Sequence, residues 1–296
     1  MREGTSMLVT GLKKTKHAAY VIAKRSGRLA RTARFAGLDA AGRMAPLIPG
    51  SRPYTYDPAR YRRSFLTRQP PQTDGGIELP RRVFVVWTGE NPMSPNRLRN
   101  LERLRSTIGL PVELVTPQTL DRWVVAGHPL HPVYEHLSLV HRSDYLRAYL
   151  LHHHGGGYCD LKAPLHSWAP AFEAMQADPS IWVTGFRELS SAMVSRLPGR
   201  LGLDLALHHR SLVGMGAFLV RSHTPLTAEW LAEVERRLDY FEPQAAEYPG
   251  GTRGEVVGYP VSWTDILGKV FHPLQLKYLD HIRVDDRLLL EFENYQ

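Results

Sequence analysis

The chain has 296 residues, of which 43% are hydrophobic, so it is long enough to bury the core of one large domain or two small ones. Its one cysteine, Cys159, excludes a disulfide within the chain, and no apolar run reaches the ~18 residues that a membrane-spanning helix needs. The N-terminus lacks the continuous apolar segment of a secretory signal, so we expect a cytoplasmic protein.

Residues 1–68 carry most of the basic charge. They hold 15 Lys and Arg against three acidic residues, whereas the whole chain has a net charge of +8. The segment GLKKTKHAAYVIAKRSGRLARTARFAGL can form a basic amphipathic helix that lies on the inner face of an anionic membrane. A solvated N-terminal segment that contacts no membrane is an alternative of equal weight. Binding to nucleic acid is not expected, because no nucleic-acid motif accompanies the charge.

The next elements favour an open α/β sheet. A Pro-, Tyr- and Arg-rich connector leads to a domain boundary near residue 77. RRVFVVWTG (81–89) and PVELVT (111–116) have the pattern of buried strands, and the helix predicted between them begins with Ser94 as its N-cap. Strand, helix and strand at this spacing predict a parallel βαβ unit.

The second half continues this pattern. Strands are predicted over 181–186 and 211–220, followed by a periodic helix over 227–241 with Thr224 as its cap. No GxGxxG motif follows the first strand, which disfavours a dinucleotide cofactor. We therefore expect a basic arm and connector over 1–76 and one Rossmann-like domain with a mostly parallel sheet over 77–296.

The stretch HRSDYLRAYLLHHHGGGYCDLK, residues 141–162, predicts a helix, a glycine break and a short strand that ends at Asp160. Ligands bind at the carboxyl ends of strands in such sheets, so Asp160 is a candidate site residue. Asp144 and Arg147 share one face near the start of the helix. Taken alone, Asp144 and Arg147 are explained as an ordinary ion pair, and Asp160 as a turn-forming residue at the end of a strand. Consecutive histidines on a helix point in different directions, so the run HHH does not predict a metal site.

This stretch resembles the sugar-binding region of GT-A glycosyltransferases related to capsular-polysaccharide and fungal mannosyl transferases. A similar signature occurs in the large clostridial glucosylating toxins. The resemblance is carried by a serine-aspartate pair, an arginine three residues on, and Gly-Gly-x-Tyr-x-Asp, which here are Ser143, Asp144, Arg147, Gly156, Gly157, Tyr158 and Asp160. It extends more loosely to the strand that ends at Trp87, and it leaves the first 76 residues uncovered.

The resemblance implies a GT-A fold, a nucleotide-sugar donor and transfer with retention of anomeric configuration. Trp87 would flank the base, Asp144 and Arg147 would hold sugar and phosphates, and Asp160 would contact ribose or sugar. Arginine suits anionic oxygens, and a carboxylate accepts from sugar hydroxyls. Three further residues are weaker candidates for the donor site, with core packing as the alternative: Gly214, Gly216 and Trp263.

The sequence departs from the family at Lys162, which stands where the family's DXD motif has the aspartate that binds Mn²⁺ or Mg²⁺. An ammonium group repels a hard cation. Lys162 either takes the electrostatic role of the metal at the diphosphate, or marks a chain that binds nucleotide sugars or glycans without turning them over. A third alternative keeps a metal on Asp160, with Asp265 or Glu188 as the second carboxylate. We expect a glycosyltransferase with a glycan or lipid-linked acceptor in capsular or other surface polysaccharide synthesis.

Overall fold

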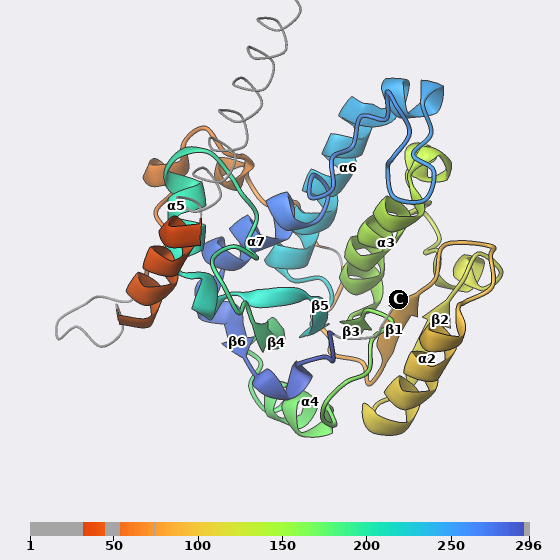
Figure 1. The fold of residues 1–296 in the computed structure, drawn as a ribbon, viewed down its shortest axis with the longest axis horizontal. Coiled ribbons are helices and arrows are strands. Elements are labelled where there is room, and N and C mark those ends of the chain that lie inside the picture. The colour runs from red at the N-terminus through yellow and green to blue at the C-terminus, as the bar shows by residue number, and fades with distance from the viewer. Residues whose placement is uncertain (1–31, 45–53, 74, 293–296) are drawn as a thin grey trace, which may run out of the picture.

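The computed structural model describes residues 32–44, 54–73 and 75–292, which form an α/β fold around one six-stranded sheet (Figure 1). The strands are β1 (Val83–Val86), β2 (Val112–Val115), β3 (Gly156–Cys159), β4 (Val183–Arg187), β5 (Val213–Val220) and β6 (Ile282–Val284). The helices are α2 (Pro95–Thr107), α3 (Leu139–His154), α4 (Ala169–Gln176), α5 (Gly199–Leu207), α6 (Pro225–Glu247) and α7 (Gly268–Lys277), and residues 32–44 are also helical.

The sheet has the order β2-β1-β3-β5-β4-β6 and is mostly parallel. β1 pairs in parallel with β2 and β3, and β4 pairs in parallel with β6, whereas β5 runs antiparallel to both of its neighbours. The predicted parallel βαβ unit is confirmed, since β1, α2 and β2 occupy the predicted segments. The arrangement is compatible with a Rossmann-like fold.

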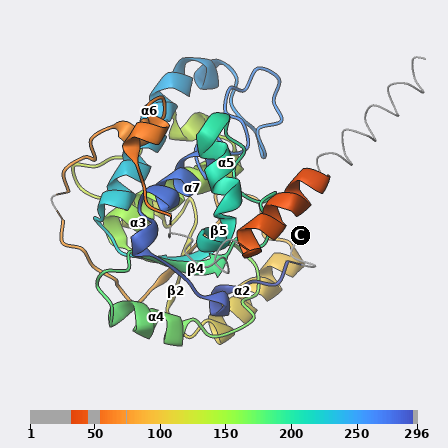
Figure 2. The same ribbon diagram turned by 90° about the vertical axis from the view of Figure 1, so that its left-hand side faces the viewer.

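Alternation along the strands divides the core between the two faces of the sheet. Phe84, Tyr158 and Phe218 pack with side chains of α3, α6 and α7, whereas Val85 and Leu219, on the other face, pack with α2 and α4. Side chains point to opposite faces at successive strand positions, so this division follows from the period of two. Figure 2 shows the helices on both sides of the sheet.

Predicted helix caps form as hydrogen bonds. The hydroxyl of Ser94 accepts from the backbone N–H of Arg97 at the start of α2, and the hydroxyl of Thr224 accepts from that of Thr227 at the start of α6. Each cap satisfies one of the backbone donors that a helix leaves free at its N-terminus. Among the described residues, no helix has both the length and the apolar character to span a bilayer.

The connector before residue 77 contributes to the core, which its sequence did not predict. Tyr61 and Leu66 are buried in the cluster that also contains Phe84 and Phe218. The hydroxyl of Tyr61 donates to buried Asp204 on α5 at 2.7 Å. The connector has no regular hydrophobic period, because it packs through isolated aromatic and aliphatic side chains on short 3₁₀ turns. The predicted boundary therefore does not separate it from the core.

Candidate functional site

The candidate site lies at the carboxyl edge of the sheet, where β1 and β3 end and the antiparallel β5 begins. Trp87 follows β1 and Asp160 follows β3, while Met215 and Gly216 lie near the start of β5. The backbone N–H of Asp160 donates to the carbonyl of Gly216 at 2.8 Å, so β5 fixes the position of the aspartate. This is the edge at which ligands bind in open α/β sheets.

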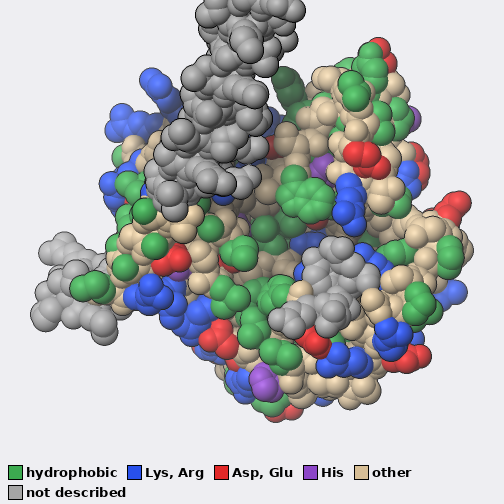
Figure 3. All heavy atoms as spheres, in the orientation of Figure 1, with side chains coloured by type: hydrophobic (Ala, Val, Ile, Leu, Met, Phe, Trp, Pro, Cys, Tyr) green, Lys and Arg blue, Asp and Glu red, His purple; other side chains and the backbone are tan. Residues whose placement is uncertain are grey.

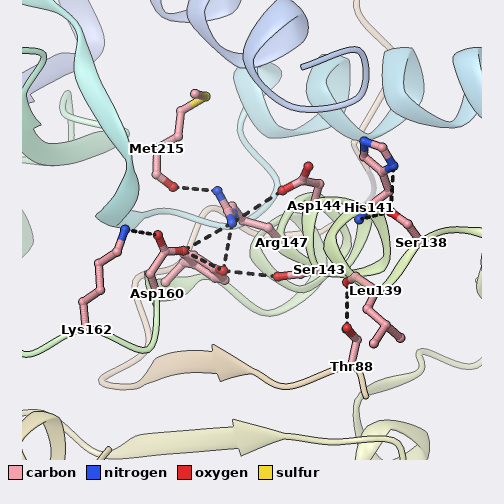
Figure 4. A network of polar contacts seen from close by, with 11 residues as sticks. Thr88, Ser138, Leu139, His141, Ser143, Asp144, Arg147, Asp160, Lys162 and Met215 are labelled. Carbon is pink, nitrogen blue, oxygen red and sulfur yellow. Dashed lines mark hydrogen bonds and ion pairs between the residues drawn. The ribbon is translucent and has the colours of Figure 1, made fainter. Parts of the chain in front are cut away.

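Helix α3 brings its first turns to the same edge. The hydroxyl of Ser138 caps the helix by accepting from the backbone N–H of His141. The helix ends at Gly155, whose φ of 60° lets the chain turn back into β3, as the glycine run predicted. Because α3 runs toward the amino ends of the parallel strands, its N-terminal half, with Asp144 and Arg147, lies near Asp160 (Figure 4).

Arg147 is at the centre of the contacts. Its Nη1 donates to the carbonyl of Met215 at 2.6 Å, and its Nη2 donates to the hydroxyl of Tyr158 at 2.8 Å. The same Nη2 lies 3.5 Å from Asp160 Oδ1 and 3.6 Å from Asp144 Oδ1. Arg147 is 5% exposed, so this planar fork is held by the fold before any ligand arrives.

Both oxygens of the Asp160 carboxylate have protein partners. Oδ1 accepts from the Tyr158 hydroxyl at 3.1 Å, and Oδ2 accepts from Lys162 Nζ at 3.0 Å. The ammonium of Lys162 also lies 5.1 Å from the centroid of the Phe292 ring. We refer to five side chains, Asp144, Arg147, Tyr158, Asp160 and Lys162, as the Asp160 cluster; Figure 4 shows it from close by.

Burial shifts the ionisation of the cluster. It raises the pKa of Asp144 to about 7; Arg147 acts against this increase and Asp160 adds to it. Burial alone would lower the pKa of Arg147, but its contacts with Tyr158, Asp160 and Asp144 together outweigh burial, so the pKa is raised. Burial also raises the pKa of the Tyr158 hydroxyl, which keeps it a hydrogen-bond donor. The carboxyl group of Asp144 therefore changes its charge near neutral pH.

The donor set at Asp160 does not suit a divalent cation. Two cationic side chains already face its carboxylate, and a third positive charge would be repelled. The other candidate ligands are used elsewhere: Asp265 pairs with Lys269, and buried Glu188 pairs with His272. Among the described residues, no three His, Cys, Asp or Glu side chains are placed to hold a metal ion.

The two tryptophans differ in their surroundings. Trp87 is half-buried at the end of β1; its indole N–H donates to the carbonyl of Asn91 at 2.9 Å, and the guanidinium of Arg97 lies 5.1 Å from its ring centroid. Trp263 lies in the turn before α7 and is 60% exposed. Its indole is accessible for stacking on a ligand, whereas one side of the Trp87 ring already has a cationic neighbour.

Of the predicted glycines, Gly216 is the one that lies against the Asp160 carboxylate. A Cβ atom on Gly216 would lie 3.0 Å from Asp160 Oδ2, so the absence of a side chain makes room for the carboxylate. A Cβ on Gly214 would meet the ring of Phe186 at 2.2 Å, and a Cβ on Gly157 would meet Leu219. Gly156 and Gly157 lie at the amino end of β3, so the structure does not bring them to the carboxyl edge.

The sequence did not indicate two contacts that support the site. The carbonyl of Met215 binds Arg147 across 68 positions, and the hydroxyl of Tyr259 lies 2.9 Å from Nδ1 of buried His141. The flanking glycines of GMG were the only signal for Met215, because they allow its backbone to approach another segment. Tyr259 has no such signal, since its partner is 118 positions away.

Figure 3 shows a hollow in the middle of the face seen in Figure 1, between α3, α7 and β5, with hydrophobic and basic side chains around it. No protein family model matches this chain, and no curated protein sequence matches it. The chemical character of the site therefore rests on its geometry. A fixed guanidinium, an ammonium and two carboxylates provide donors for anionic oxygens and acceptors for hydroxyls.

Proposed function

We propose that this chain is a GT-A-type glycosyltransferase that moves a sugar, with retention, from a nucleotide-sugar donor to a glycan or lipid-linked acceptor in surface polysaccharide synthesis. The observation that carries the proposal is the pair formed by Lys162 Nζ and Asp160 Oδ2 at 3.0 Å, directly after a strand at the carboxyl edge of the sheet. It puts a cation at the position where the resemblance expects a metal.

In the proposed reaction, the bond between the anomeric carbon and the diphosphate oxygen breaks, and its electron pair leaves with the nucleoside diphosphate. The acceptor oxygen bonds to the anomeric carbon, and its proton passes to the departing diphosphate. Lys162 stabilises the charge that develops on the diphosphate, a role in which a fixed cation is more useful than bulk water. Asp144 and Asp160 accept from hydroxyls of the donor, and Arg147 positions Asp160.

The competing proposal is a nucleotide-sugar or glycan-binding protein of the same fold that does not turn its ligand over. The fully paired carboxylate of Asp160 favours it, since three protein groups already surround this side chain. A donor sugar has to compete with these contacts for the same oxygens. Binding and turnover must therefore be measured separately.

Hydrolysis of a panel of nucleotide sugars, measured once with Mn²⁺ and once with EDTA, tests the proposal. We expect hydrolysis that survives EDTA and falls by about 100-fold or more in Lys162→Ala, in the range found when a preorganised charge is removed from a transition state. Lys269→Ala is the matched control, because it removes the lysine of another Lys–Asp pair. Hydrolysis only with Mn²⁺ would rule out the lysine as the substitute. Calorimetric nucleotide binding without turnover, even with acceptor glycans present, would favour the binding protein.

A further inference from the structure

A second group of cationic side chains lies on the flank of the molecule formed by residues 32–44, α5 and the 3₁₀ turn η6 (His209–Ser211). There a cavity of about 380 Å³ is lined by three arginines from three elements. Arg43 comes from the helix over 32–44, Arg187 from the end of β4, and Arg210 from η6. Arg187 is paired with Asp286, at 3.0 Å.

The helix over residues 32–44 is fixed to the body by its acidic side chain. Asp39 accepts from the backbone N–H of Ser191 at 2.7 Å and from the hydroxyl of Ser190 at 3.0 Å. Glycine at position 42 allows the helix to pack closely against α5, since a Cβ on Gly42 would lie 2.8 Å from the carbonyl oxygen of Leu207. The negative charge therefore points inward, while Arg34 and Arg43 are exposed.

On α5 an aspartate again points inward: Asp204 is 1% exposed and accepts hydrogen bonds from Tyr61 and Arg200. Seven arginines lie on this flank, and the aspartates beside them are Asp39, Asp57, Asp204 and Asp286, so basic side chains outnumber acidic ones. We call this surface the arginine face; its arginines are Arg34, Arg43, Arg60, Arg187, Arg196, Arg200 and Arg210. Figure 3 shows Lys and Arg side chains along this left-hand flank.

Large apolar side chains are exposed among these arginines. Met44 is 61% exposed at the end of the helix, and Met193 is 62% exposed in the loop whose neighbouring serines bind Asp39. Leu189 and Leu203 are also exposed. Apolar side chains set among arginines are typical of proteins that rest on a lipid surface, where the arginines bind phosphates and the apolar groups enter the headgroup boundary. A nucleic acid would not take up the apolar groups.

The sequence that leads into this face has the same charge. Residues 1–31 hold eight Lys and Arg and one acidic residue, and they join the helix directly at residue 32. We propose that the arginine face docks on an anionic lipid bilayer, with lipid phosphates bound by Arg43 and Arg210 at the cavity. This inference goes beyond the glycosyl transfer proposed above and does not depend on it.

The arginine face and the Asp160 cluster meet at one strand. Arg187 is in register with Val213 of β5, and Met215, whose carbonyl binds Arg147, is two residues further along. Two residues of a strand span about 7 Å. A bilayer at the arginine face would therefore lie beside the carboxyl edge of the sheet. If the proposed transfer is correct, which this step assumes, a lipid-linked acceptor reaches the site without leaving the membrane.

Flotation of the full chain with vesicles tests the proposal. We expect binding to vesicles that contain about one third phosphatidylglycerol, little binding to pure phosphatidylcholine, and weaker binding as salt screens the charges. The double variant Arg43→Glu/Arg210→Glu should bind phosphatidylglycerol vesicles at least about tenfold less well, because four units of charge change at the surface. Arg43→Lys/Arg210→Lys should retain binding, since it keeps the charge.

The matched control is Arg105→Glu/Arg122→Glu, which reverses two exposed arginines on α2 and the turn after β2, on the opposite flank (Figure 1). Circular dichroism and thermal melting verify that each variant is folded. Equal binding by the Arg43/Arg210 reversal and the control, equal binding to both lipids, or no binding to either would overturn the proposal. So would preferential binding to duplex DNA at the same salt concentration. None of these results depends on donor hydrolysis.

Discussion

At the scale of single residues, burial controls the ionisation of Asp144. The residue is 4% exposed, and burial raises the pKa of its carboxyl group from 3.8 to about 7 despite the nearby Arg147. The native state therefore binds a proton that the unfolded state has released between these two values. The contribution of Asp144 to the free energy of unfolding is largest below pH ~4 and falls until pH ~7. Above that pH it stays constant.

Asp144→Asn should remove this pH dependence. We expect the difference in unfolding free energy between the variant and the wild type to shift in favour of the variant as the pH rises from about 4 to about 7. Urea unfolding at several pH values measures it. Burial lowers the pKa of His141 and of His152 to about 4, so these histidines make the free energy of unfolding rise with pH. Both histidines are present in the variant and in the wild type, so they do not affect the difference. Asp121→Asn, at an exposed position, is the control. Parallel curves for Asp144→Asn and the wild type would show that folding does not raise the pKa of Asp144.

At the scale of one strand, β5 carries two glycines whose surroundings predict opposite effects. Gly216→Ala would place a methyl group 3.0 Å from Asp160 Oδ2, so the carboxylate has to shift by a few tenths of an ångström relative to Lys162. Gly214→Ala drives a methyl group into the Phe186 ring, and such overpacking costs about 1–3 kcal/mol. We expect Gly216→Ala to lower donor hydrolysis with little loss of stability, and Gly214→Ala to lower stability.

Each glycine variant is the control for the other. Urea unfolding and hydrolysis are measured on both, with activity compared at a urea concentration and temperature at which each is fully folded. If Gly216→Ala unfolds as readily as Gly214→Ala but keeps its specific activity, the space beside Asp160 is needed only for packing.

Strand β5 shows which features of the structure its sequence could predict and which it could not. The apolar run over 211–220 predicts β5 itself, because a buried strand needs little else. Its antiparallel direction, and the resulting contact between Met215 and Arg147, depend on how the chain returns to the sheet after α5. That choice is made by packing between segments distant in sequence. Asp160, by contrast, was predictable, because it follows directly from a local helix–glycine–strand pattern.

At the scale of the whole molecule, the connector before residue 77 shows why a boundary is harder to predict than an element. Composition marks residues 54–68 as a loop, since proline and arginine interrupt any period. Their contacts are long-range: Lys277 Nζ donates to the carbonyl of Leu66 at 3.1 Å, and Arg68 pairs with Glu233 at 3.1 Å. One buried side chain every few residues is enough to join such a segment to a core, and no periodicity results.

Leu66→Ala tests whether this segment stabilises the fold. The side chain is 1% exposed within the main core cluster, so its truncation should lower the free energy of unfolding by about 2–5 kcal/mol. Leu98→Ala on α2, at a position that is 49% exposed, should change it by less than about 0.5 kcal/mol. Urea unfolding of the full chain measures both. Equal, small effects would mean that the body folds without the connector, and removal of residues 1–76 would then leave its stability unchanged. A large effect confined to Leu66 requires instead that any shortened chain retain residues 54–68.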